Sequence, residues 1–94
     1  MSKDLEDIKK KALPILKEAG VTRSSVFGSY ARGENNNSDI DLLIDFPRGK
    51  GLFEFVGLQQ KLEEALGKKV DLGEFNSLKP RIKDSVLSQQ VRII

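Results

Sequence analysis

The sequence predicts a small α/β (α+β) domain in which a mixed β-sheet packs against helices. Three observations support this fold class: a helix-period apolar pattern opens the chain, an alternating strand pattern occupies residues 39–46, and a second helical pattern at 52–66 precedes another short strand. Helices and strands that alternate in this way form a layered α/β arrangement. Because the chain has 94 residues, we expect one domain that covers residues 1–94.

The first twenty residues are expected to form one helix. Apolar residues recur there at spacings of three and four, namely at Leu5, Ile8, Ala12, Ile15, Leu16 and Ala19. Gly20 follows as a C-cap. Pro14 lies inside the pattern and removes one helical hydrogen bond, so we expect a bend there rather than an end.

Two strands are expected in the first half of the chain. Residues 24–28 form a short strand because Val26 and Phe27 are apolar, and one helical turn over 30–32 follows. After a polar loop at 34–38, residues 39–46 form the clearest strand. Its apolar residues alternate with its carboxylates, so one side of this strand is predicted to face the core.

The second half repeats the pattern after a basic loop at 47–51. A helix is expected over 52–66, with Gly67 as its stop and with one core-facing stripe made of Leu52, Phe55, Gln59, Leu62 and Leu66. A third strand follows at 69–75. Asn76 or Ser77 is then expected to cap a last helix along which Leu78, Ile82 and Val86 align, and β-branched residues at 91–94 predict an edge strand.

Composition excludes several kinds of chemistry. The chain has no cysteine and no histidine, which excludes disulfides, thiolate and imidazole metal sites and a Ser-His-Asp triad. A metal must therefore be held by oxygen, which favours Mg²⁺ or Mn²⁺. The net charge of +2 is too balanced to indicate nucleic-acid binding by itself. No apolar run is long enough for a membrane span and residues 1–6 are charged, so the expected location is the cytoplasm.

The carboxylates on the predicted strands suggest a metal site. Asp39 and Asp41 are two residues apart, so both point to the same face of their strand. Asp71 opposes the apolar face of another strand, and the three carboxylates converge if these strands are neighbours. Such a group can bind two Mg²⁺ ions about 3.5–4 Å apart, as in-line phosphoryl displacement requires. Asp45 has the same parity but lies roughly 13 Å along the strand, so it is assigned to the strand end.

A phosphate site is expected upstream of these carboxylates. Gly28 allows phosphate to approach the backbone, and Ser29 offers a hydroxyl and an N–H at the start of a helical turn. Arg32 follows one turn later and can add a charge-assisted contact. Each feature alone has an ordinary structural explanation, since Asp-x-Asp is usually a solvated strand face and Arg32 can pair with an acidic neighbour. The joint pattern is what favours nucleotidyl transfer.

The same residues carry a family resemblance. The segments GSYARG at 28–33 and SDIDL at 38–42 resemble the signature of the DNA polymerase β-like nucleotidyltransferases, and most of all their minimal nucleotidyltransferase branch. The likeness continues through 57–72 and 78–82, so it spans nearly the whole chain. It implies the polymerase β-like nucleotidyltransferase fold.

The resemblance also implies roles for individual residues. Asp39, Asp41 and Asp71 would ligate Mg²⁺, most simply two ions, and Asp71 would help to deprotonate the acceptor hydroxyl. Gly28 and Ser29 would hold the triphosphate of ATP, and Arg32 matches an arginine of the family motif. All three acidic positions of the family are present, so nothing in them indicates an inactive enzyme.

Members of the minimal branch are often antitoxins whose partner is a HEPN-domain toxin. The resemblance therefore implies transfer of AMP from ATP to a tyrosine of such a partner. Two alternatives stay open: a non-catalytic module that neutralises a toxin by contact, and nucleotidyl transfer to RNA or a small molecule. The basic residues Arg48, Lys50, Lys68 and Lys69 are read as solubilising surface charge, so neither nucleic acid nor membrane is the expected partner, whereas a homodimer is compatible with the sequence.

Overall fold

The computed structural model describes residues 3–31, 39–78, 81 and 88–94 of the chain. Helices and strands alternate along it, as the sequence predicts. In chain order the described elements are α1 (Lys3–Glu18), β1 (Arg23–Phe27), α2 (Gly28–Ala31), β2 (Ile40–Asp45), α3 (Leu52–Leu66), β3 (Val70–Glu74), the 3-10 helix η1 (Phe75–Ser77) and β4 (Val91–Arg92).

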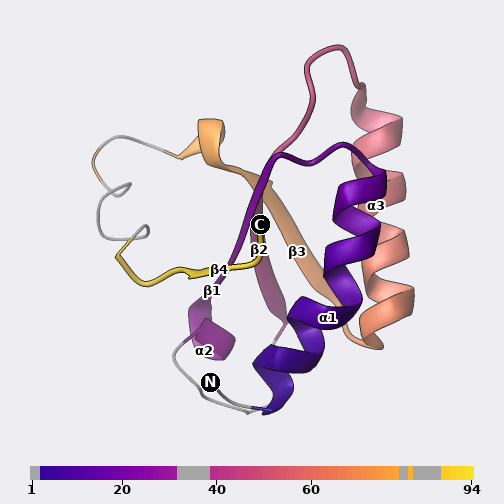
Figure 1. The fold of residues 1–94 in the computed structure, drawn as a ribbon. Helices are drawn as coiled ribbons and strands as arrows, with labels where there is room; N and C mark the ends of the chain where they lie inside the picture. The colour runs from indigo at the N-terminus through magenta and orange to yellow at the C-terminus, as the bar shows by residue number, and fades with distance from the viewer. Residues whose placement is uncertain (1–2, 32–38, 79–80, 82–87) are drawn as a thin grey trace.

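The strands form one mixed sheet in the order β3-β2-β1-β4. β1 pairs with β2 and with β4 in antiparallel fashion, whereas β2 and β3 are parallel. α1 and α3 lie side by side over one face of this sheet, and α2 lies at the end of the sheet opposite the loop that joins β2 to α3 (Figure 1). The predicted fold class, a mixed sheet packed against helices, is confirmed.

α1 runs through Pro14 as a single helix. Proline lacks the N–H that an interior helical position donates, but the buried positions on either side of it hold the helix against the sheet. Gly20 ends the helix in the left-handed region at φ 83°, and the N–H of Val21 donates to the carbonyl of Leu16 at 3.0 Å. Both the helix and its glycine C-cap are as predicted.

The core lies between the helical layer and one face of the sheet. Alternate residues of β2 are buried, and Val70 and Leu72 are buried on β3, as period-2 strands require. The buried cluster consists of Leu5, Ile8, Ala12, Leu16, Val21, Val26, Ile40, Leu42, Ile44, Leu58, Leu62, Val70 and Leu72.

One predicted core position is wrong. Leu52 was placed on the buried stripe of α3, but its side chain is 76% exposed. The stripe begins one turn later, where Leu58 and Leu62 are buried and Phe55 packs on Phe46 with ring centroids 5.8 Å apart. The reason is that Leu52, in the first turn of α3, borders an open hollow with Gly73 and Glu74 and does not pack on the strand.

The last part of the chain matches the expectations only where it can be compared. Val91–Arg92 pairs with β1 at the sheet edge, which confirms an edge strand shorter than predicted. Asn76 and Ser77 belong to η1, while Ile82 and Val86 of the expected final helix lie outside the described residues. In the described part of the chain, no helix combines the length and the apolar character that a membrane span needs.

Candidate active site

Asp41 and Asp71 lie opposite each other on neighbouring strands. β2 and β3 pair in parallel, and the register places Asp41 directly against Asp71. The residues beside them, Ile40, Leu42 and Val70, are buried under the helices, so both carboxylates stand on the other face of the sheet. Since adjacent strands are about 4.8 Å apart, the predicted meeting of carboxylates from separate strands is realised for this pair.

Asp39 stands apart from this pair. It precedes the first residue of β2 and its side chain is exposed, although its parity puts it on the same face. Among the described residues no group of three or more carboxylates is close enough to hold a metal ion. The backbone register therefore fixes two of the three predicted carboxylates, and the third is on an exposed backbone segment beside them.

Gly28 lies directly against the Asp41 carboxylate. It follows β1, begins α2 and has φ 71°, a region that favours glycine. A Cβ atom on Gly28 would clash with Oδ2 of Asp41 and would lie 3.4 Å from its Cγ. The cause is the register, because Phe27 pairs with Asp41 across β1 and β2. The predicted phosphate turn therefore lies against the predicted metal-binding carboxylate, and it can do so because glycine has no side chain.

The structure describes less of the other two predicted phosphate-binding residues, Ser29 and Arg32. Ser29 is the second residue of α2, so the helical turn starts earlier than the predicted 30–32. Arg32 lies outside the described residues. Asp45 is the last residue of β2 and pairs with Arg23, which agrees with its assignment to the strand end.

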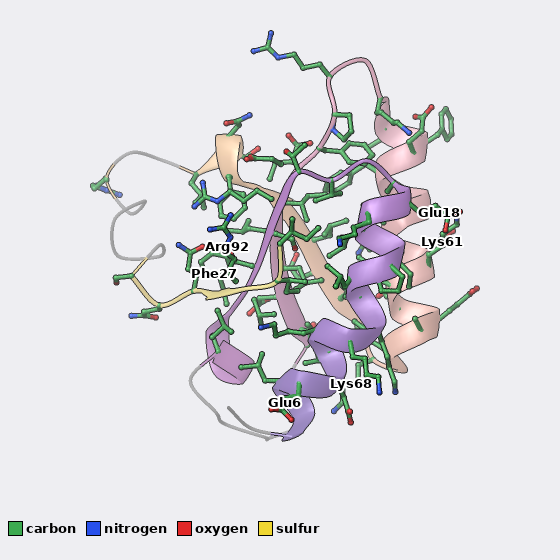
Figure 2. All side chains as sticks on the ribbon, in the orientation of Figure 1. Glu6, Glu18, Phe27, Lys61, Lys68 and Arg92 are labelled. Atoms are coloured by element: carbon green, nitrogen blue, oxygen red, sulfur yellow. The ribbon has the colours of Figure 1, made fainter. Side chains whose placement is uncertain are left out.

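The paired carboxylates border a shallow hollow of about 300 Å³. Its walls are Phe27, Asp41, Leu42, Leu43, Asp71 and Gly73. Figure 2 shows Phe27 on the side of the sheet away from α1 and α3, whereas Glu18 and Lys61 lie on the helical side. The hollow is therefore on the sheet face that the helices leave open.

Sequence reasoning missed the side chains that hold the start of β3. Gln59 Nε2 donates to the carbonyl of Val70 at 2.9 Å, and the N–H of Val70 donates to Glu63 Oε2 at 3.0 Å. These two bonds from α3 satisfy the outer edge of β3 at the residue before Asp71. The i, i+4 spacing of Gln59 and Glu63 indicates that both lie on one side of the helix, but the sequence pattern assigns Gln59 to an apolar stripe.

An aromatic contact beside the hollow was also missed. The rings of Phe27 and Phe75 meet edge to face with centroids 6.2 Å apart, and the Arg23 guanidinium carbon lies 4.2 Å from the Phe75 ring centroid. Phe75 is 3% exposed, so η1 covers part of the open face next to the site. No sequence spacing indicated this contact, because it depends on where η1 turns after β3.

The donor set fits a hard divalent cation. The paired groups are carboxylates from adjacent strands, and Gly28 leaves open the space that a Cβ would fill. Carboxylate oxygens are the ligands that Mg²⁺ and Mn²⁺ prefer, and side-by-side carboxylates repel each other unless a cation lies between them.

Comparison with known proteins agrees with the fold. Residues 9–93 match the model of the nucleotidyltransferase domain family. A Methanocaldococcus jannaschii protein named as a candidate protein adenylyltransferase is 47% identical over 92 residues, which cover 97% of this chain and 99% of that protein. The protein adenylyltransferase MntA of Thermococcus cleftensis is 44% identical over 79% of this chain and 76% of its own length.

Solved structures give the same result. A candidate minimal nucleotidyltransferase superposes with a TM-score of 0.81 at 37% identity over 94% of both chains. A chain from a toxin–antitoxin complex with AMP-PNP superposes with a TM-score of 0.77 at 27% identity, over 92% of this chain and 72% of that one. The chain therefore belongs to the nucleotidyltransferase domain family, in its minimal, polymerase β-like form, and is an enzyme of the nucleotidyltransferase type.

Proposed function

We propose that the chain is a Mg²⁺-dependent enzyme that transfers AMP from ATP to a tyrosine hydroxyl of a partner HEPN-domain toxin and so acts as an antitoxin. One observation carries the proposal. Asp41 faces Asp71 across β2 and β3, and Gly28, at the start of α2, leaves room for the Asp41 carboxylate. A carboxylate pair beside a glycine turn is the arrangement that nucleotidyl transfer needs.

The proposed roles are those that the family motif implies. Asp39, Asp41 and Asp71 hold the metal, and Gly28, Ser29 and Arg32 hold the triphosphate. Bound Mg²⁺ would neutralise phosphate charge and polarise the phosphoryl oxygens. Because Asp39 is exposed at the entry to β2, its side chain can turn toward the pair without disturbing packed residues.

In the proposed reaction the acceptor hydroxyl oxygen bonds to the α-phosphorus of ATP. The bond from that phosphorus to the bridging oxygen of the β-phosphate breaks, and pyrophosphate leaves with the electron pair. Asp71 accepts the hydroxyl proton. This carboxylate is the more exposed of the opposed pair, so it is the one that an acceptor from solution can reach.

A protein acceptor is supported by the relatives and by the size of the chain. The most similar relatives described above are named for protein adenylylation, and the superposed toxin–antitoxin complex contains an ATP analogue. The hollow on the open sheet face is shallow, so a large acceptor needs further contacts outside it.

Intact-mass spectrometry tests the proposal. The purified HEPN-domain protein of the same genome is incubated with Mg-ATP and either the wild-type chain or Asp39→Asn/Asp41→Asn. We expect the partner to gain the mass of one or more AMP groups with the wild type and none with the variant. Absence of added mass on the partner, or equal addition with the variant, would refute the proposal. AMP on RNA or on a small molecule in the same reactions would identify a different acceptor.

A non-catalytic antitoxin is the second candidate, and one observation favours it. The three carboxylates do not form a ready metal-binding group among the described residues, so neutralisation by contact alone is chemically simpler. Growth rescue separates the two functions: if Asp39→Asn/Asp41→Asn still protects cells from the toxin as fully as wild type, contact is the function.

A further inference from the structure

The first turns of α3 carry an exposed apolar patch. Leu52 is 76% exposed, Phe53 93% and Val56 39%. Because residues three and four apart adjoin on a helix, Val56 lies beside both of the others and the patch is continuous. Its area is roughly 400 Å², which matches the largest patch on a typical monomer and is often functional. The rest of the exposed side of α3 is polar, with Gln60, Lys61 and Glu64.

Positive charge borders this patch. Residues 48–54 are all exposed, and they include Arg48 and Lys50 in the loop before α3. The one carboxylate of this run, on Glu54, accepts the N–H of Gly51 at 2.9 Å and so caps the helix. A surface that fits this one would present apolar side chains beside carboxylates.

A hollow lies between the patch and the end of β3. It has a volume of about 470 Å³, with Leu52 and Lys50 on one side and Gly73, Glu74 and Ser77 on the other. Gly73 is also a wall of the hollow that holds Asp41 and Asp71. The two hollows therefore share one wall residue on β3, which is an edge strand of the sheet.

We propose that Leu52, Phe53, Val56, Arg48 and Lys50 form a docking surface, called here the α3 docking surface, for the acceptor protein that receives AMP. This inference rests on the proposed function. A standard protein interface covers about 800 Å² on each partner and is thus roughly 30 Å across. The chain itself measures 35 × 33 × 19 Å, so a partner with an interface of that size that wraps around the β3 edge of the sheet can touch both the patch and the open face.

A second copy of the chain fits the patch less well. The patch supplies about half of the surface that a stable dimer buries on each side. In a two-fold contact of the patch with itself, Arg48 and Lys50 of both copies would also be drawn together, and like charges at an interface oppose association. An acidic, apolar partner surface avoids this repulsion.

Binding measurements without nucleotide test the docking surface separately from catalysis. The probe is the purified HEPN-domain protein of the same genome, and calorimetry gives its Kd for wild type, for Leu52→Ser/Phe53→Ser and for the control Gln60→Ala on the same helix. We expect at least a tenfold weaker Kd for the double variant and no change for the control, as for truncation of interface hot spots. Arg48→Glu/Lys50→Glu should also weaken binding, with a smaller dependence on salt than wild type.

Two further measurements keep the outcomes distinct. The rise in Tm with Mg-ATP should be equal in wild type and Leu52→Ser/Phe53→Ser, because these exposed residues are outside the nucleotide site. An unchanged partner Kd in the double variant overturns the docking surface even if AMP transfer occurs. The proposal is also wrong if Leu52→Ser/Phe53→Ser leaves partner binding unchanged but removes another kind of binding. A fall in solution mass from dimer to monomer would show that the patch serves a second copy. Loss of binding to anionic lipid vesicles would show that it serves a membrane. Patch-dependent binding without AMP transfer by wild type refutes the proposed function alone.

Discussion

Gly28→Ala tests the contact between the phosphate turn and the metal carboxylate. At φ 71° an alanine costs about 1–2 kcal/mol, which corresponds to a fall in Tm of roughly 4–16 °C for a domain of this size. The new Cβ also clashes with Oδ2 of Asp41, so the carboxylate must rotate away from α2. A displacement of about 1 Å at a reacting centre can lower turnover by about a hundredfold. We therefore expect kcat for AMP transfer, per folded molecule, to fall by about that factor.

Gly67→Ala is the matched control. Gly67 has φ 67°, nearly the same backbone conformation, but nothing lies within 4 Å of the position that its Cβ would occupy. Thermal unfolding should show a similar loss of stability in both variants, while AMP transfer at a temperature where both are folded should fall only in Gly28→Ala. Equal activity in the two variants, whether high or low, would refute the reasoning that Gly28 is required by Asp41.

Three more predictions follow from the described contacts. Gln59→Ala and Glu63→Ala each remove one side-chain hydrogen bond to the backbone of Val70, so they should lower kcat for AMP transfer without raising KM for ATP. Gln60→Ala should change neither constant; steady-state kinetics checks this, and unchanged kcat would contradict it. Leu62→Ala removes a fully buried side chain and should lower the free energy of unfolding by about 2–5 kcal/mol in urea titration; a loss below about 1 kcal/mol would show that the site collapses. Mg-ATP at a hundred times its Kd should stabilise the chain by about 2.7 kcal/mol, and a melting curve that does not move would count against a nucleotide site.

The fold was predictable from the sequence where local pattern and burial agree. The alternation in β2 fits only a strand, and the spacing of apolar residues in α1 fits only a helix. The bounds of both elements were therefore predicted within two residues. Leu52 shows the limit of this reasoning. Helical spacing gives the direction of a side chain around the axis, but burial depends on whether another element reaches that turn, and that depends on tertiary structure.

The candidate site was predictable in its residues and only partly in its geometry. Parity put Asp41 and Asp71 on corresponding faces, yet only strand order could show that they are direct neighbours. The contacts of Phe75, and those of Gln59 with Val70, join segments whose approach no local pattern encodes. The role of Arg32 stays a prediction from the family motif.

A double-mutant cycle on Asp41 and Asp71 tests the central claim, that these two carboxylates act together on one metal-bound reaction. Asp41→Asn and Asp71→Asn are each expected to lower kcat/KM for AMP transfer to the partner by roughly 10²–10³-fold. If both serve one site, the double variant should be no worse than the poorer single variant, because residues that act as a unit are not additive. Losses that multiply in the double variant, or wild-type kcat/KM in either single variant, would contradict the account.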